Sequence, residues 1–194
     1  MNIRGFCNFT DIYDHLVSEA EDGAKFVEIG ALFGASSVYM ADRIKESGKK
    51  IEFHVVDVWD ARGIDGSLLG KDDFDYFRYA GIPEVNLDKN SDILYYAFLK
   101  GVFENGVTQF IFPVKLPSVF ASTLYTDKSL DFVFIDADHR YEGVLADIKA
   151  WLPKVRDGGI IAGHDYDWEG VFKAVNEMFE GKIIKTGTSW MVQL

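Results

Sequence analysis

Two histidines of this sequence follow apolar runs that have the character of strands, and each could act on a proton. His139 lies three residues beyond Asp136, and His164 follows the run at residues 159–163. An imidazole with its ordinary pKa of about 6.5 can accept a proton from a hydroxyl group at neutral pH. We therefore predict His139 and His164 as candidate bases in one cleft. The alternative is that each is a structural histidine bonded to its own loop.

A glycine-containing turn follows another short apolar run, residues 25–29. The run carries an acid, Glu28, and the turn holds Gly30 and Gly34 at a wider spacing than the G-x-G-x-x-G of dinucleotide sites. An acid at a strand end suits a ligand with a cationic amino group. Gly30 removes a Cβ that would block this ligand, and Gly34 lets the turn enter the next helix. Ser36 and Ser37 either bond the ligand's carboxylate or cap that helix.

A second acid, Asp57, closes the next apolar run 27 residues beyond Gly30. A carboxylate there can accept both hydroxyl groups of a ribose, as it does in other doubly wound sheets. Taken alone, Asp57 could be a turn residue or a helix N-cap, and Glu28 could be an acid on the surface. Together, and each on a strand end, the two acids predict a ligand that contains a nucleoside.

The elements that must position these side chains alternate between strand and helix. A β-turn-α-β order indicates a parallel sheet with right-handed crossovers, and the last segment, residues 182–194, has the pattern of an antiparallel hairpin around Thr186-Gly187-Thr188. The predicted strands span residues 25–29, 51–58, 109–114, 130–135 and 159–163. The predicted helices span residues 11–20, capped by Thr10, and 36–46, 93–103, 119–124, 142–152 and 170–179.

The composition narrows the class of protein. The 194 residues predict one domain, 1–194, and the formal net charge of −11 disfavours nucleic acid as a partner because a polyanion is repelled. No segment has the length and apolarity of a membrane span, no secretory signal is visible, and the single cysteine cannot form an internal disulfide. A cytoplasmic location is therefore the default expectation. The oligomeric state stays open, with a homo-oligomer possible.

An irregular stretch at residues 59–106 interrupts the alternation. It is rich in aromatic and acidic residues and contains one expected helix, 93–103. Connections of this length inside a compact domain are usually functional, and the aromatic content argues against disorder. We predict an inserted cap over the ligand cleft that shapes the acceptor pocket, with packing at the sheet edge as the alternative.

The segments at residues 131–141 (DFVFIDADHRY) and 158–166 (GGIIAGHDY) resemble the fourth-strand and fifth-strand motifs of class I S-adenosylmethionine (SAM)-dependent methyltransferases. The small-molecule O-methyltransferases of the caffeoyl-CoA, catechol and macrocin types are the most similar groups. The resemblance covers residues 26–60 and 109–166. It implies an α/β fold with a Rossmann-like, doubly wound, mostly parallel seven-stranded sheet and an antiparallel C-terminal hairpin strand.

The resemblance also implies roles for the residues of the cleft. Glu28, Gly30 and Ser36 occupy the positions that hold the amino-acid part of SAM, whose amino group and sulfonium are cationic. Asp57 matches the acid that binds the ribose. Ser118, after the third strand, lies where the family approaches the adenine.

The metal-dependent relatives imply a further site. There an acid at the fourth strand end, matched by Asp136, lies beside the cofactor and joins an adjacent pair at the fifth strand end. The matching pair is His164 and Asp165, whereas Asp-Asn or acidic-Asp is typical. The expectation is a divalent cation, Mg²⁺ or Mn²⁺, at Asp136, His164 and Asp165, with the imidazole shifting preference away from Mg²⁺. Otherwise His164 is a base or an orienting residue and Asp165 caps the next segment of the chain.

The expected reaction is methyl transfer to the hydroxyl oxygen of a small molecule, in which Asp136, His139 and His164 are the catalytic candidates. A cation would bind the acceptor oxygen; without one, His139 or His164 would remove its proton. The Asn/Asp-Pro-Pro-Tyr/Phe sequence of many base-methylating enzymes is absent after the fourth strand. Three alternatives stay open: an NAD-dependent oxidoreductase, a non-catalytic SAM-fold module, and a metal-dependent hydrolase.

Overall fold

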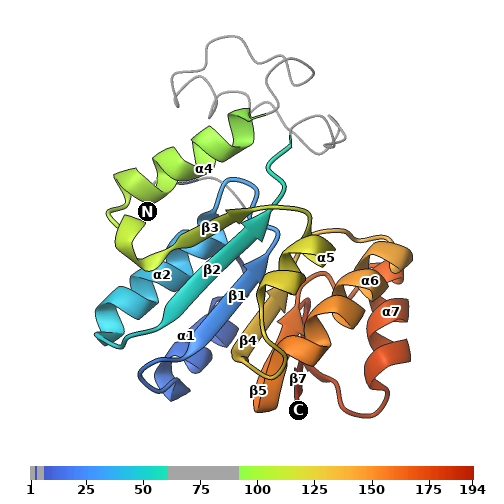
Figure 1. Ribbon diagram of the computed structural model, residues 1–194. Coiled ribbons are helices and arrows are strands. Elements are labelled where there is room, and N and C mark those ends of the chain that lie inside the picture. Colours follow the sequence, from blue (N-terminus) through green and yellow to red (C-terminus); the bar gives the residue numbers. More distant parts are fainter. Residues whose placement is uncertain (1–2, 4–6, 61–91) are drawn as a thin grey trace.

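One sheet organises the chain, for which we obtained a computed structural model that describes residue 3, residues 7–60 and residues 92–194. Within these residues the sheet has seven strands in the order β3-β2-β1-β4-β5-β7-β6 (Figure 1). The strands are β1 (Lys25–Ile29), β2 (Glu52–Asp57), β3 (Phe112–Lys115), β4 (Leu130–Ile135), β5 (Val155–Gly163), β6 (Ile184–Thr186) and β7 (Ser189–Gln193).

The pairing of the strands confirms the predicted doubly wound sheet with its C-terminal hairpin. β1 pairs in parallel with both β2 and β4, β2 with β3, and β4 with β5. β7 runs antiparallel to β5 and to β6. The central strands β1 and β4 are almost continuously buried because helices cover both faces of the sheet.

Helices cover both faces of the sheet (Figure 1). α1, α2 and α4 contribute to one apolar core and α5, α6 and α7 to the other. The described helices are α1 (Thr10–Glu19), α2 (Ala35–Ser47), α4 (Ile93–Glu104), α5 (Ser118–Ala121), α6 (Tyr141–Trp151) and α7 (Glu169–Phe179), with 3₁₀ turns η3 (Thr108–Phe110), η4 (Ser122–Leu124) and η5 (Leu152–Lys154). None of the described helices is long and apolar enough to cross a membrane.

Three predicted boundaries were wrong. The strand expected at 109–114 is divided, because the amide of Phe110 donates to the carbonyl of Val107 and closes η3 before β3 begins. β5 begins at Val155, before the predicted start at residue 159, and its pairing with β4 contains a register shift between Leu130 and Phe132. Thr10 is the first residue of α1, and no side chain caps this helix.

Only the two ends of the predicted cap, 59–106, are described, and residues 61–91 lie outside the described residues. At one end Trp59 is fully buried. Its ring centroid lies 4.6 Å from that of Phe98 and 4.9 Å from that of Tyr95, both on α4 at the other end. The indole N–H of Trp59 donates to the carbonyl of Leu32 over 3.0 Å. Both ends of the segment are thus packed together against the core.

Candidate active site

The carboxyl ends of four parallel strands meet at one edge of the sheet. The chain turns one way from β1 through β2 to β3 and the other way from β4 to β5, so the strand order reverses between β1 and β4. Ligands of open α/β sheets bind at such a reversal, outside the carboxyl ends of the strands. The predicted residues after β1, β2, β4 and β5 therefore face one region.

The turn after β1 requires a glycine because of a neighbouring strand end, and the predicted role of this glycine toward a ligand stays a prediction. Gly30 has φ +85°, and a Cβ at this position would lie 2.0 Å from the carbonyl oxygen of Asp136. The side chain that Gly30 lacks would thus collide with the end of β4. Gly34, with φ +91°, begins α2, and its missing Cβ leaves room for the ring of Phe98.

Asp57 organises the same turn through its carboxylate. Its Oδ2 accepts hydrogen bonds from the amides of Ala31 (2.8 Å) and Leu32 (3.0 Å), and its Oδ1 accepts one from the amide of Trp59 (2.7 Å). A carboxylate can accept about four hydrogen bonds in total. The three backbone contacts therefore leave capacity for about one further hydrogen bond, whereas both ribose hydroxyls were predicted to bind here.

Glu28 is buried between α1 and α2, with 1% of its surface exposed. The hydroxyl of Tyr13 donates to its Oε1 over 3.1 Å, and the hydroxyl of Ser37 donates to its Oε2. Burial raises the pKa of Glu28 to about 7, although the hydroxyls of Ser36, Ser37 and Tyr13 oppose the shift. In the structure, Ser36 and Ser37 thus face the carboxylate of Glu28.

Ser118 begins α5 and contacts α6. Its hydroxyl accepts a hydrogen bond from the indole N–H of Trp151 over 2.9 Å. Burial raises the pKa of Asp147 to about 6, and a hydrogen bond with Ser118 opposes that shift. These contacts join α5 to α6. Ser118 thus has a structural role in addition to its predicted position near an adenine.

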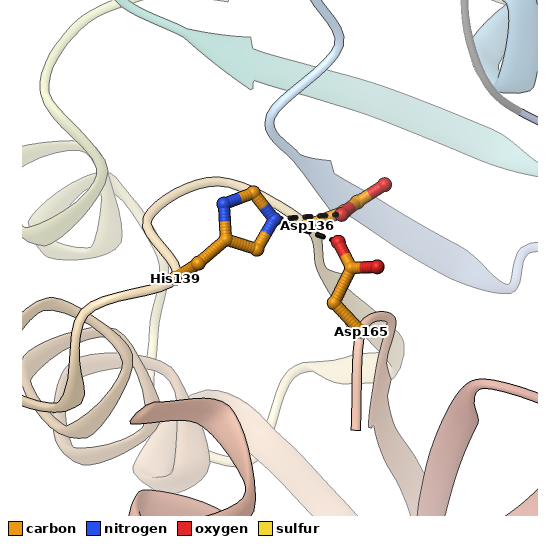
Figure 2. A group of neighbouring side chains, drawn as sticks. All are labelled: Asp136, His139 and Asp165. Atoms are coloured by element: carbon orange, nitrogen blue, oxygen red, sulfur yellow. Dashed lines mark ion pairs between the residues drawn. The ribbon is translucent and has the colours of Figure 1, made fainter. Parts of the chain in front are cut away.

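Asp136, His139 and Asp165 form a compact cluster at the ends of β4 and β5, and Figure 2 shows their side chains pointing toward one another. One potential ligand atom from each residue lies within 4.8 Å of the others. The Nε2 atom of His139 is 2.7 Å from Oδ2 of Asp165 and 3.9 Å from Oδ1 of Asp136. This nitrogen is buried and forms no hydrogen bond of ordinary geometry with the described residues.

His164, the expected third ligand, is buried behind this cluster. Its Nδ1 lies 3.2 Å from Oδ1 of Asp165 and 3.8 Å from Oδ1 of Asp136. Its Nε2 lies 2.8 Å from the hydroxyl oxygen of Thr188, in the turn between β6 and β7. The structure therefore brings both predicted histidines to the two aspartates, and His139 completes the most compact set of possible metal ligands.

The charges of the cluster depend on one another. Burial raises the pKa of Asp136 to about 6, and the nearby imidazole of His164 opposes this shift. Burial also tends to raise the pKa of Asp165, but His139 and His164 outweigh it and hold this pKa well below its usual range. The carboxylate of Asp165 in turn raises the pKa of His139. Asp165 is thus a stable anion between two imidazoles.

Backbone strain gathers at this edge of the sheet. Positive φ angles are uncommon for residues other than glycine, and they often mark functional positions. Three such residues, Leu32 (φ 50°), Trp59 (φ 43°) and Asp165 (φ 53°), follow β1, β2 and β5. The loops of the candidate site are therefore held in conformations that the surrounding contacts must stabilise.

The sequence interpretation missed three residues of the site. Tyr13 reaches Glu28 from α1, Thr188 reaches His164 from the C-terminal hairpin, and Trp168 lies with its ring centroid 4.6 Å from that of His139. Tyr13 and Thr188 are distant in sequence from their partners, so no local pattern connects them. Trp168 follows Asp165 by three residues, and an aromatic side chain so near the motif was the available signal.

Comparisons with known proteins show which family and which solved structures this chain is similar to. A family model described as a methyltransferase domain matches residues 27–166. The structure is similar to cofactor-bound Rv0187 from MTB, with a TM-score of 0.66, 16% identity, and coverage of 100% of this chain and 82% of that chain. No curated protein matches the chain.

Two further solved structures share the fold. The O-methyltransferase NovP gives a TM-score of 0.61 and 18% identity over 95% of this chain and 78% of its own. A proposed rRNA-methylase from Clostridium thermocellum gives a TM-score of 0.58 and 13% identity over 98% of this chain and 100% of its own. At such identities the likeness shows the fold alone. The family match covers most of the chain and every strand end of the site, so the chain belongs to the methyltransferase-domain family and is a class I SAM-dependent methyltransferase.

Proposed function

We propose that the protein transfers the methyl group of SAM to a hydroxyl oxygen of a small molecule. The observation that carries the proposal is the cluster of Asp136, His139 and Asp165, which lies beside the glycine turn expected to hold the methyl donor. The backbone at Gly30 touches the backbone at Asp136. A donor held by the turn would therefore meet an acceptor held by the cluster.

In this proposal the turn after β1 binds SAM with the help of Asp57 and Glu28, as predicted from the sequence. Asp57 fixes the turn through its three backbone hydrogen bonds and offers its remaining acceptor site to a hydroxyl of the ribose. Glu28 supplies negative charge beneath the turn for the cationic amino-acid end of SAM. That carboxyl is protonated over part of the neutral range because its pKa is about 7, and a bound cation would favour its ionised form.

The residues of the cluster then bind the acceptor and accept the proton of its hydroxyl. His139 accepts the proton of the acceptor hydroxyl, and Asp165 stabilises the imidazolium that forms. The ring of Trp168 stacks on His139 and limits its rotation. Methyl transfer requires the acceptor oxygen in line with the sulfonium, and orientation of this kind can supply about 7 kcal/mol or more.

The donor set also fits a divalent cation. Two carboxylates and an imidazole suit Mn²⁺ or another transition metal better than Mg²⁺, and Nε2 of His139 and Oδ2 of Asp165, which lie 2.7 Å apart, could both bind one ion. We propose Asp136, Asp165 and His139 as ligands, with His164 as a further ligand or as the residue that orients Asp165. When bound, such an ion would lower the pKa of the acceptor hydroxyl.

The first experiment measures binding of SAM and S-adenosylhomocysteine by calorimetry, with and without Mn²⁺ or Mg²⁺, and then methyl transfer to a panel of phenols and sugars. Asp136→Ala should abolish transfer, because the residue lies at the junction of donor and acceptor, while Asp157→Ala on the exposed surface should leave transfer unchanged. Turnover close to wild type in Asp136→Ala would refute the central role of this residue.

RNA is the competing class of acceptor. The net charge of −11 opposes binding of a polyanion, and we propose a small-molecule acceptor and no nucleic-acid partner.

A non-catalytic SAM-binding module is the other candidate, and it would bind SAM yet transfer no methyl group to any acceptor. The cytoplasmic location and the possible homo-oligomer stay predictions of the sequence.

A further inference from the structure

A cavity of about 240 Å³ lies at the amino ends of the strands, away from the candidate active site. It is formed by the beginnings of β1, β2 and β4, by β3, and by the loop between η4 and β4. The candidate active site is at the carboxyl ends of the same strands. This cavity is therefore a separate feature of the molecule.

The cavity exists because one face of the sheet is incompletely covered. α6 and α7 pack on the half that contains β4 and β5, but the connection from β3 to β4 contains only the single turn α5 and the 3₁₀ turn η4 (Figure 1). Large apolar side chains remain exposed along this connection and on β3, among them Phe112, Phe120 and Leu124. Of these, Leu124 lines the cavity, and an exposed apolar group beside a hollow is a sign of a ligand or partner site.

The walls of the cavity combine an apolar floor with an ordered polar chain. Val27, Val114 and Leu130 provide apolar lining. On the polar side, Nδ1 of His54 is 2.7 Å from the hydroxyl of Tyr125 and its Nε2 is 2.9 Å from Oε1 of Glu52. The imidazole is thus held on both sides, with the carboxylate of Glu52 fixed at the edge of the hollow.

Two opposite charges that line the cavity remain available to a ligand. The ammonium nitrogen of Lys25 lies 3.9 Å from Oε2 of Glu52, which is longer than a hydrogen bond, and both side chains are about half exposed. The pair offers a cation and an anion side by side. A ligand complementary to both must carry an ammonium and a carboxylate group on neighbouring atoms.

We propose that this cavity binds a free apolar α-amino acid. Its ammonium group would bond to Glu52, its carboxylate to Lys25, and its side chain would cover the accessible apolar lining, Val114 and Leu124. The volume equals that of about eight water molecules at about 30 Å³ each, which suits a molecule the size of leucine or phenylalanine. A zwitterion also has no net charge, so the net charge of −11 does not repel it as it would a simple anion.

The test is a titration of the full chain with L-leucine and L-phenylalanine, in which binding is measured by calorimetry and ligand-observed NMR. It is carried out with and without saturating S-adenosylhomocysteine, so that binding at the methyl-donor site is recognised by competition. Two analogues each keep one charge: 3-phenylpropionate and 2-phenylethylamine. Three variants address the cavity, Lys25→Gln, Glu52→Gln and Val114→Phe, and Lys182→Gln on the exposed surface is the control, with folding of each checked by circular dichroism.

The proposal expects both amino acids to bind whether or not adenosylhomocysteine is present. Each single-charge analogue, and each of the two charge variants, should bind about tenfold more weakly, the usual effect of losing a hydrogen bond to a charged group. Val114→Phe should block binding by filling the hollow, and Lys182→Gln should behave as wild type.

Three results would overturn it: no binding of either amino acid, equal binding of the single-charge analogues, or wild-type affinity in Lys25→Gln and Glu52→Gln. Loss of amino-acid binding in the presence of adenosylhomocysteine would also overturn it, because it would place the ligand in the donor site. Failure of the proposed methyl transfer leaves each of these readouts intact, so the two hypotheses fail separately.

Discussion

Glu28 is a buried carboxyl group that the fold keeps close to its point of titration. Three hydroxyls face it, those of Tyr13, Ser36 and Ser37, yet burial dominates and raises its pKa from 4.5 to about 7. A carboxyl whose pKa is raised by folding favours the folded state only while it is protonated. The residue that is expected to attract a cationic ligand is therefore a source of pH dependence in the free protein.

Glu28→Gln should remove that dependence. Since the folded-state pKa is the higher one, wild-type stability should decline between about pH 4.5 and about pH 7 through this group, and the loss is on the order of 3 kcal/mol. Glutamine stays neutral, so the variant should be more stable than wild type at pH 8 and equal to it near pH 4.5. Urea unfolding at both pH values measures the difference, and a difference that does not change with pH would contradict the raised pKa.

Asp57→Ala should weaken both the fold and donor binding. Three backbone amides lose their acceptor, and each buried donor left without one costs about 1–3 kcal/mol before water compensates. We expect the free energy of unfolding to fall by about 2 kcal/mol or more, and affinity for adenosylhomocysteine to fall with it. Chemical unfolding and calorimetry measure the two effects. Asp157→Ala, whose side chain is 86% exposed, is the matched control and should change neither.

At the scale of elements, the turn between β1 and α2 is the part of the site most constrained by its neighbours. Gly30 has a positive φ and lies against the end of β4, so both conformation and space require glycine. Gly23, with φ +91°, shares the conformation, but a Cβ there would meet no atom within 4 Å. Alanine at Gly23 therefore measures the cost of backbone strain alone, whereas alanine at Gly30 measures strain and collision together.

Gly23→Ala should lower stability by about 1 kcal/mol, the ordinary cost of a positive φ in alanine. Gly30→Ala should cost several times as much or prevent soluble expression, because a backbone carbonyl 2.0 Å away cannot move without shifting β4. Thermal unfolding of both variants provides the comparison. Equal losses of stability would show that the approach of the turn to Asp136 is looser than the structure indicates.

Several elements could be predicted from the sequence because their patterns are local. The bounds of β1 and β4 were predicted without error, since each is a short apolar run between polar turns. The glycine turn and the acids near the ends of β1 and β2 were also identified from strand-end positions, whereas the role of Asp136 came from the resemblance to a family motif. The contact of Gly30 with the end of β4 was not predicted, because the two segments lie more than a hundred residues apart in the sequence. The contacts of Tyr13 with Glu28 and of Thr188 with His164, which span 15 and 24 residues, were missed because no local pattern connects these positions.

At the scale of the whole molecule, acidic residues exceed basic ones by 11. A field of this sign repels polyanions at long range and favours neutral or cationic ligands, of which SAM is one. The same field works against recognition of RNA, because that recognition draws much of its affinity from basic residues that neutralise phosphates.

The protein should therefore not bind RNA at physiological salt. Electrophoretic mobility assays with transfer RNA and ribosomal RNA fragments, in the presence of adenosylhomocysteine, measure this directly. A basic homologue of the fold serves as the positive control for the assay. A specific shift at micromolar protein, persisting as salt is raised, would contradict the small-molecule acceptor proposed for the site.

Trp59 and α4 bring the start and the end of the segment 61–91 into contact on the core, through rings 4.6 Å apart. A segment whose two ends are fixed side by side can be exchanged for one of another length without changing the distance that the chain must bridge. The domain is thus a suitable host for grafts: segments from other members of the family, joined at Trp59 and at α4, could give chimeras that share one donor site and differ in the acceptor they take.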